Sequence, residues 1–213
     1  MQGEYRNQTR KEEIINAAIH GLGLLFAIIA VPFLITKAAG SGKPELFFAI
    51  CVYSFGLIAV YFCSTFYHII IDPALKRRAN IADHISIFFL IGGTYTPIIL
   101  LYTNPTLSLV FLSVQWIIIA LGTILKVFFT GRYNTLSLIL YTLLGWMLVF
   151  IIKPVYQSMP LNIFCWVIAG GICYTIGIIF YRLDSKTHAH NIWHCFVLTG
   201  TILHFIAIYK CVG

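Results

Sequence analysis

Long apolar runs alternate with short polar breaks along the whole chain. A run of roughly 18 or more residues with few charges is long enough to cross a bilayer as a helix. The breaks contain glycine, proline or charged residues, as in "GSGKPE", "DPALKRRAN", "TNP" and "KPVYQSMP". The pattern predicts seven spans, over residues 16–37, 46–70, 81–101, 107–126, 133–152, 161–181 and 189–209. We therefore expect an all-α, seven-helix membrane bundle that forms a single domain over residues 1–213.

The composition agrees with a multi-pass protein of the cell membrane. Of the 213 residues, 60% are hydrophobic and 10% are charged, whereas soluble domains carry about 25% charged residues. The formal net charge of +7 could suggest a nucleic-acid partner. The Lys and Arg residues lie in short loops, however, so a membrane orientation signal explains the charge and we expect no nucleic acid. The six cysteines form no CxxC pair and are expected to be packing residues.

The positive charges also predict an orientation, because Lys and Arg accumulate in cytoplasmic loops. One side of the predicted bundle holds ten of them: Arg6, Arg10, Lys11, Lys76, Arg77, Arg78, Lys126, Arg132, Arg182 and Lys186. The other side holds four: Lys37, Lys43, Lys153 and Lys210. We therefore expect the N-terminus in the cytoplasm and the C-terminus outside.

Two histidines enter the last span together, in the stretch "THAHNIWHC". His190 and His194 are four residues apart, so both project from one face of a helix. This spacing lets a helix offer two nitrogens to a single metal ion. Alternatively, the two side chains could be solvated histidines at the membrane interface.

Other polar side chains are predicted to lie in the same cytoplasmic layer. The second span ends with His68 in "CSTFYHII", and the third begins with Asp83 in "ANIADHISIFF". Ionisable residues in a span are costly and mark functional sites by default. We expect His68, His190 and His194 to bind one metal ion. Three imidazoles with an open fourth position are typical of catalytic zinc, although imidazole also suits copper, iron and nickel.

Asp83 and Ser64 are the candidate catalytic residues beside this predicted metal. Zinc lowers the pKa of its bound water to roughly 7, and Asp83 could hold that water or accept its proton. Ser64 lies one helical turn from His68 and could donate to a carbonyl oxygen or orient the water. Alternatively, the Ser64 hydroxyl bonds to the carbonyl four residues earlier, as often happens in membrane helices.

Three other histidines are not expected to bind the ion. His84 lies about 100° around the helix from Asp83, so we interpret it as a packing or interfacial residue. His188 precedes the last span and is expected to be solvated. His204 follows His190 by 14 residues, about 21 Å along a helix axis. It is expected to make a hydrogen bond within the bundle near the far side.

A polar stripe enters the first span in "KEEIINAAIHG". Glu12, Asn16 and His20 are spaced at intervals of four and share one helix face. They could face the cavity of the predicted metal. Equally, the acid could cap the helix while the other side chains make helix-to-helix hydrogen bonds.

Four of these motifs carry a family resemblance: "EEIINAAIHG", "STFYH", "ADH" and "HNIWH" followed by His204. In this order the chain resembles the hemolysin III family of bacterial membrane proteins. That family is similar to the progestin and adipoQ receptors and, more distantly, to alkaline ceramidases. The resemblance implies a seven-helix bundle with zinc near the cytoplasmic face, bound by His68, His190 and His194. It also implies that Asp83 contacts zinc through water, with Ser64 beside it.

Three functions remain open at this stage. The receptor branch of the resemblance is associated with ceramide-type amide hydrolysis, and the bacterial branch with haemolysis and membrane-lipid homeostasis. We favour a zinc-dependent hydrolase that acts on an amide or ester of a membrane lipid. The alternatives are a cytolytic, pore-forming protein, and a sensor or receptor of membrane state in which zinc is only structural.

Overall fold

The computed structural model describes residues 8–130 and 133–213 of the chain. Its elements are α1 (Arg10–Gly40), α2 (Pro44–Ile69), α3 (Pro73–Tyr102), α4 (Pro105–Phe129), α5 (Asn134–Gly145), η1 (Met147–Ile151), α6 (Ile152–Ser158), α7 (Leu161–Arg182) and α8 (Ala189–Cys211). Seven helical segments are long and apolar enough to cross a membrane, the fifth being built from α5, η1 and α6. The protein is therefore an all-α, multi-pass membrane protein, as predicted.

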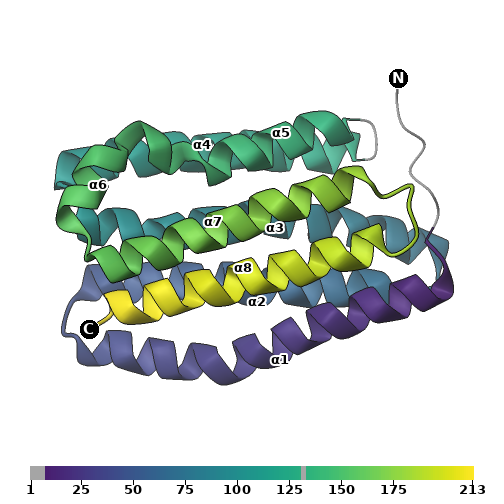
Figure 1. The fold of residues 1–213 in the computed structure, drawn as a ribbon, viewed down its shortest axis with the longest axis horizontal. Coiled ribbons are helices and arrows are strands. Elements are labelled where there is room, and N and C mark those ends of the chain that lie inside the picture. Colours follow the sequence, from purple (N-terminus) through teal and green to yellow (C-terminus); the bar gives the residue numbers. More distant parts are fainter. Residues whose placement is uncertain (1–7, 131–132) are drawn as a thin grey trace.

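The helices run along the long axis of one bundle, with the start of α1 and the end of α8 at opposite ends (Figure 1). Helix α2 packs between α1 and α3, and α8 packs against α7 and α1. The end of α2 and the start of α8 consequently lie at the same end of the bundle as the start of α1. We call this the N-terminal end. Arg6 and Arg132, which counted toward the predicted orientation, lie outside the described residues.

Two glycines allow α2 and α3 to approach each other closely. A Cβ atom on Gly56 would lie 2.5 Å from the carbonyl oxygen of Phe89, and one on Gly93 would lie 3.0 Å from Cα of Tyr53. Small residues at such crossings let helix backbones pack by direct van der Waals contact, which is the main attraction between helices in lipid. This contact fixes α2 against α3, and with it the relative positions of His68 and Asp83.

Helix α3 extends beyond the predicted third span, because it begins eight residues before residue 81, at Pro73. Asp72 caps the helix by accepting a hydrogen bond from Leu75 N at 2.8 Å, and proline suits the first helical position. The charged stretch "KRR" belongs to a predicted break between spans. It forms instead the first turns of α3, which brings Lys76 close to the end of α2.

The fifth span is also broken where the sequence predicted a continuous helix over 133–152. Helix α5 ends at Gly145, a poor helix former, and a 3₁₀ segment leads into α6. Most of "KPVYQSMP", predicted as a break, is helical. The Tyr95 hydroxyl joins the interruption by donating to Gly145 O at 2.7 Å and accepting from Leu148 N at 3.1 Å. A side chain thereby satisfies backbone groups that the break frees.

Replacing Tyr95 with phenylalanine should lower the free energy of unfolding by about 1–2 kcal/mol, because both hydrogen bonds at the break are lost while the ring remains. Denaturant titration in detergent micelles would measure the change. Tyr209→Phe is the matched control, since Tyr209 is exposed and its ring contacts remain in that variant. Equal stability of Tyr95→Phe and the control would contradict the role assigned to Tyr95.

Candidate metal centre

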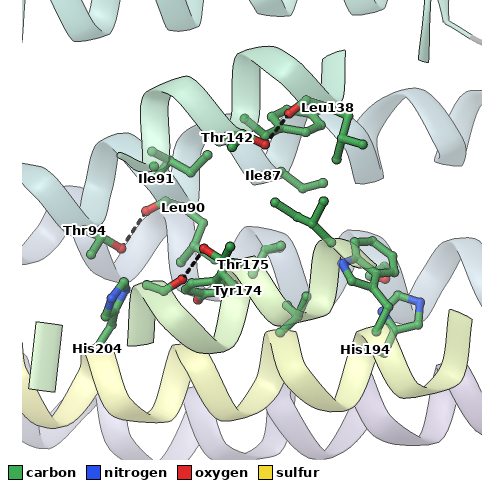
Figure 2. A pocket seen from close by; sticks show the side chains of 18 of the residues that line it. Ile87, Leu90, Ile91, Thr94, Leu138, Thr142, Tyr174, Thr175, His194 and His204 are labelled. Carbon is green, nitrogen blue, oxygen red and sulfur yellow. Dashed lines mark hydrogen bonds between the residues drawn. The ribbon is translucent and has the colours of Figure 1, made fainter. Parts of the chain in front are cut away.

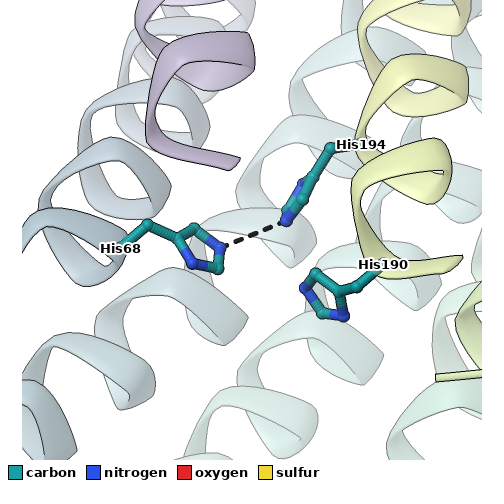
Figure 3. Close-up of side chains that lie close together, drawn as sticks. All are labelled: His68, His190 and His194. Carbon is teal, nitrogen blue, oxygen red and sulfur yellow. Dashed lines mark hydrogen bonds between the residues drawn. The ribbon is translucent and has the colours of Figure 1, made fainter. Parts of the chain in front are cut away.

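Three imidazoles from two helices meet at the N-terminal end of the bundle. His68 belongs to the last turn of α2, while His190 and His194 belong to the first turns of α8. Figure 3 shows the three rings directed toward one point. One nitrogen from each ring lies within 4.8 Å of the other two, so the group could hold a metal ion. The structure thus brings together the three predicted ligands.

The separation of two of these nitrogens is close to that expected around a zinc ion. Nε2 of His68 and Nε2 of His194 lie 3.1 Å apart. Tetrahedral Zn–N bonds of roughly 2.0–2.1 Å place two ligand nitrogens about 3.3 Å apart. His68 and His194 are each 1% exposed, whereas the side chain of His190 is 15% exposed. The His190 side of the group is therefore its more open side.

Glu13 orients His68, and the sequence analysis missed this residue. Its Oε2 lies 2.7 Å from Nδ1 of His68. A carboxylate only accepts hydrogen bonds, so Nδ1 carries the proton and Nε2 presents its lone pair toward the other two rings. Carboxylates that orient metal-binding histidines in this way are a regular feature of metal sites. Glu13 is part of the motif "EEIINAAIHG", but no sequence periodicity predicts that it lies near the end of another span.

Lys76 holds the other oxygen of the same carboxylate. Its Nζ lies 2.9 Å from Oε1 of Glu13 and also donates to Tyr67 O and Ile70 O at the end of α2. Lys76 therefore satisfies carbonyls that the end of α2 leaves free. The early start of α3, which the sequence did not predict, is what brings this lysine to the site.

A second carboxylate lies beside His190. Asp184, in the turn between α7 and α8, has Oδ1 at 3.2 Å from Nδ1 of His190, although the two groups are not aligned for a hydrogen bond. Nδ1 of His194 has no hydrogen-bond partner among the described residues. Two of the three imidazoles thus have an acidic side chain behind them, each from a different segment.

Asp83 and Ser64 line one cavity together with His20 and His194. The two candidate catalytic residues are neighbours there. Ser64 is 1% exposed, and no backbone carbonyl in the part of the chain that the structure describes accepts from its Oγ. The alternative bond to the carbonyl four residues earlier is therefore not found. Figure 2 shows the cavity, with His194 at one end and His204 at the other.

The polar stripe of α1 divides between the two predicted roles. Glu12 accepts from His188 N at 2.9 Å, and Asn191 donates both to Glu12 O and to the side chain of Asn16. These bonds join α1 to the start of α8, so Glu12 and Asn16 fit the helix-to-helix alternative. His20 faces the cavity, with its ring 4.0 Å from that of His194.

The remaining histidines lie outside the group of three. Nδ1 of His84 donates to Asn80 O at 2.8 Å, which agrees with a packing role. His188 is exposed, as predicted. It immediately precedes α8 with a left-handed backbone (φ 63°), and its ring makes a 2.8 Å hydrogen bond to Asn191. His204 donates from Nε2 to Val167 O at 3.0 Å, which is the predicted bond within the bundle.

The bundle and its buried imidazoles define an integral membrane protein of seven spans with a possible metal site at one end. Residues 8–205 match the family described as Haemolysin-III related, and the chain belongs to this family. It is 36% identical to Hemolysin-3 of Bacillus cereus, over 93% of this chain and 90% of the relative. It is 37% identical to the Hemolysin-3 homolog of Bacillus subtilis (strain 168), over 96% of each chain.

A more distant relative comes from animals. The chain is 27% identical to the Monocyte to macrophage differentiation factor of Homo sapiens, over 75% of this chain and 68% of the relative. The similarity therefore extends from bacteria to animals and covers most of the bundle.

Purified protein should retain a bound divalent metal that His68→Ala loses, because two imidazoles alone leave a weak site. Elemental analysis after extensive dialysis would measure the metal content per chain. His84→Ala is the matched control, because His84 lies on α3 outside the group and bonds to its own helix. Retention of the metal in His68→Ala, or its loss in the control, would contradict the assigned ligand set.

Glu13→Gln should lower the metal affinity, at the lower end of the roughly 10–100-fold range for lost carboxylate–histidine contacts. The amide keeps the shape of the side chain and removes the charge that favours the Nδ1–H form of His68. Competition with a fluorescent chelator would measure the affinity. The control is Glu45→Gln, which changes an exposed glutamate in the first turn of α2, at the other end of the bundle.

Proposed function

We propose that this protein is a zinc-dependent hydrolase that cleaves an amide or ester bond of a membrane lipid. The observation that carries the proposal is that His194, one of the three converging imidazoles, lines a cavity that Asp83 and Ser64 also line. A purely structural zinc site normally closes its shell with four protein ligands. Here three imidazole nitrogens converge. Asp83 and Ser64, in the cavity that His194 lines, supply an acid–base group and a hydrogen-bond donor.

His68, His190 and His194 would hold the zinc. The donor set supports this metal, because three imidazoles with no thiolate match catalytic zinc sites. When bound, zinc would supply a Lewis acid and a water of lowered pKa. Glu13 and Asp184 would keep their imidazoles turned with one nitrogen toward the metal.

Asp83 is the proposed proton carrier. Its carboxylate would take a proton from the attacking water and return it to the departing nitrogen or oxygen of the scissile bond. Ser64 would donate its hydroxyl hydrogen to the carbonyl oxygen as negative charge develops there. That hydroxyl lies beside the Asp83 carboxylate and is not committed to a backbone carbonyl of the described residues.

The cavity supports a lipid rather than a polar substrate. Apart from the groups at the metal end, many of its lining residues are apolar or aromatic, among them Ile87, Leu90, Ile91, Ile178 and Val197. It encloses about 150 Å³, less than the roughly 300–1,000 Å³ of typical small-molecule sites. A complete lipid chain would therefore need the walls to part.

The seam between α5 and α7 is the proposed entrance. Both helices line the cavity, and the exposed Trp146 donates from Nε1 to Thr175 Oγ1 at 3.1 Å between them. Trp146 lies at the break of the fifth span, where the regular helix is already interrupted. Separation of this pair would admit a chain sideways from the bilayer. With the N-terminus in the cytoplasm, the headgroup would lie near the inner leaflet.

The names of the bacterial relatives suggest cytolysis as a second candidate function. Lipid hydrolysis offers a connection, since cleavage of a two-chain lipid releases single-chain amphiphiles that disturb bilayers. Conductance of vesicles that contain the protein, unchanged by Asp83→Asn, would favour a pore. Loss of thermal stability on chelation, with no product from any lipid tested, would favour a structural metal in a sensor.

Asp83→Asn should lower turnover of a lipid amide by at least about 100-fold while the metal content stays unchanged, because the variant loses its proton carrier. Mass spectrometry of fatty acid released from vesicles that contain ceramides or ester lipids would measure the rate. Asp72→Asn is the control, since asparagine also caps a helix. Full activity of Asp83→Asn, or of metal-free protein, would exclude the proposed mechanism.

A further inference from the structure

The cavity has a second polar end, far from the candidate metal centre. It extends from His194 along α3, α5, α7 and α8 to His204 (Figure 2). The two histidines are ten residues apart on α8, which places them about 15 Å from each other. A chain bound with its scissile group at the metal end would therefore reach His204 with a distal carbon.

The hydrogen bond of His204 decides what its ring can offer to a ligand. Nε2 lies 3.0 Å from Val167 O, and a carbonyl only accepts, so Nε2 carries the proton. A charged ring inside the bundle would require a buried anion, and His204 is in no ion pair with any described residue. The ring is therefore neutral, and Nδ1 is an acceptor. Within residues 8–130 and 133–213, the hydrogen bond that this ring makes is the one from Nε2, which leaves Nδ1 available to a ligand.

The orientation of this ring is fixed by its surroundings. A Cβ atom on Gly170 would lie 2.1 Å from Cδ2 of His204, so the imidazole rests directly against the backbone of α7. The ring of Tyr174 covers it from another side, with centroids 5.3 Å apart. The acceptor is thus part of a rigid wall, which is the condition for a selective contact.

The neighbouring hydroxyl groups leave no evident donor for that acceptor. Thr94, Tyr95, Thr142 and Thr175 each donate to a backbone carbonyl, and Tyr174 is paired with Thr201. The indole of Trp146 donates to Thr175. Most of the described hydroxyl groups at this end are thus already committed as donors, and a ligand hydroxyl would supply the hydrogen that Nδ1 can accept.

We propose that the His204 end of the cavity recognises a hydroxyl group carried on the distal part of the substrate's hydrocarbon chain. The inference rests on the proposed function, because it takes the cavity to hold a lipid chain. A plain chain would leave Nδ1 without a partner, and a carboxylate would bring a second acceptor against it. The site would thus select hydroxylated chains over plain or acidic chains of similar length.

Binding of three matched amides would test this proposal without relying on turnover. The probes are dodecanamide, its terminal-hydroxy analogue and the methyl ether of that analogue, whose extended chains approximate the separation of the two cavity ends. Calorimetry with the metal-loaded protein in detergent should show about three- to tenfold tighter binding of the hydroxy compound. Moving the hydroxyl to mid-chain carbons should remove the advantage, because only the distal position reaches His204.

His204→Phe provides the second measurement. Phenylalanine keeps an aromatic ring against Gly170 and lacks the acceptor, so the preference for the hydroxy compound should disappear while dodecanamide still binds. Tyr209→Phe, outside the cavity, should behave as wild type. Equal affinities of the hydroxy and methoxy compounds for wild type would overturn the proposal, as would a preference that survives in His204→Phe.

The outcomes also separate this inference from the proposed function. If all three amides bind equally and are hydrolysed, the hydrolase stands and the role of His204 falls. If the hydroxy compound binds selectively but no amide is cleaved, the recognition site stands and the hydrolase falls. If none of them binds, the cavity takes no lipid chain and both proposals fall.

Discussion

The polar contacts between the start of α1 and the start of α8 hold the site together. Glu12 accepts the backbone N–H of His188, and Asn191 reaches back to Glu12 and Asn16. Glu12, Asn16 and Asn191 are buried, and buried polar groups need hydrogen-bond partners within the protein. This requirement fixes the first turn of α8 against α1. With that turn fixed, His190 and His194 face the ring that Glu13 orients at the end of α2.

Much of the bundle follows from the sequence, because the bilayer imposes one simple rule on length and hydropathy. All seven spans were found, and α7 and α8 begin where the pattern placed them. The predicted third span begins after the true start of α3, because charged residues are typical of loops between spans. Asp72 and Pro73 nevertheless form a standard helix start. The break after Gly145 escaped prediction, since its stabilisation by Tyr95 comes from a distant helix.

The candidate site was also predictable only in part. Histidines with helical spacing, placed in one layer by topology, were enough to find His68, His190 and His194. The carboxylates that lie behind these rings were not predicted from the sequence. Glu13 and Asp184 act across helix boundaries, and no spacing within one segment shows which acid faces which ring. The same limit applies to the cavity, whose shape depends on the packing of six helices.

One consequence concerns how such a protein is made. His68 and His194 are separated by 126 residues. The other two members of the group, His190 and His194, are therefore synthesised only with the last helix. A nascent chain would therefore need six inserted spans before the three imidazoles could meet around a metal. Metal loading would then be a final step of biogenesis, which a chain truncated before α8 could not reach.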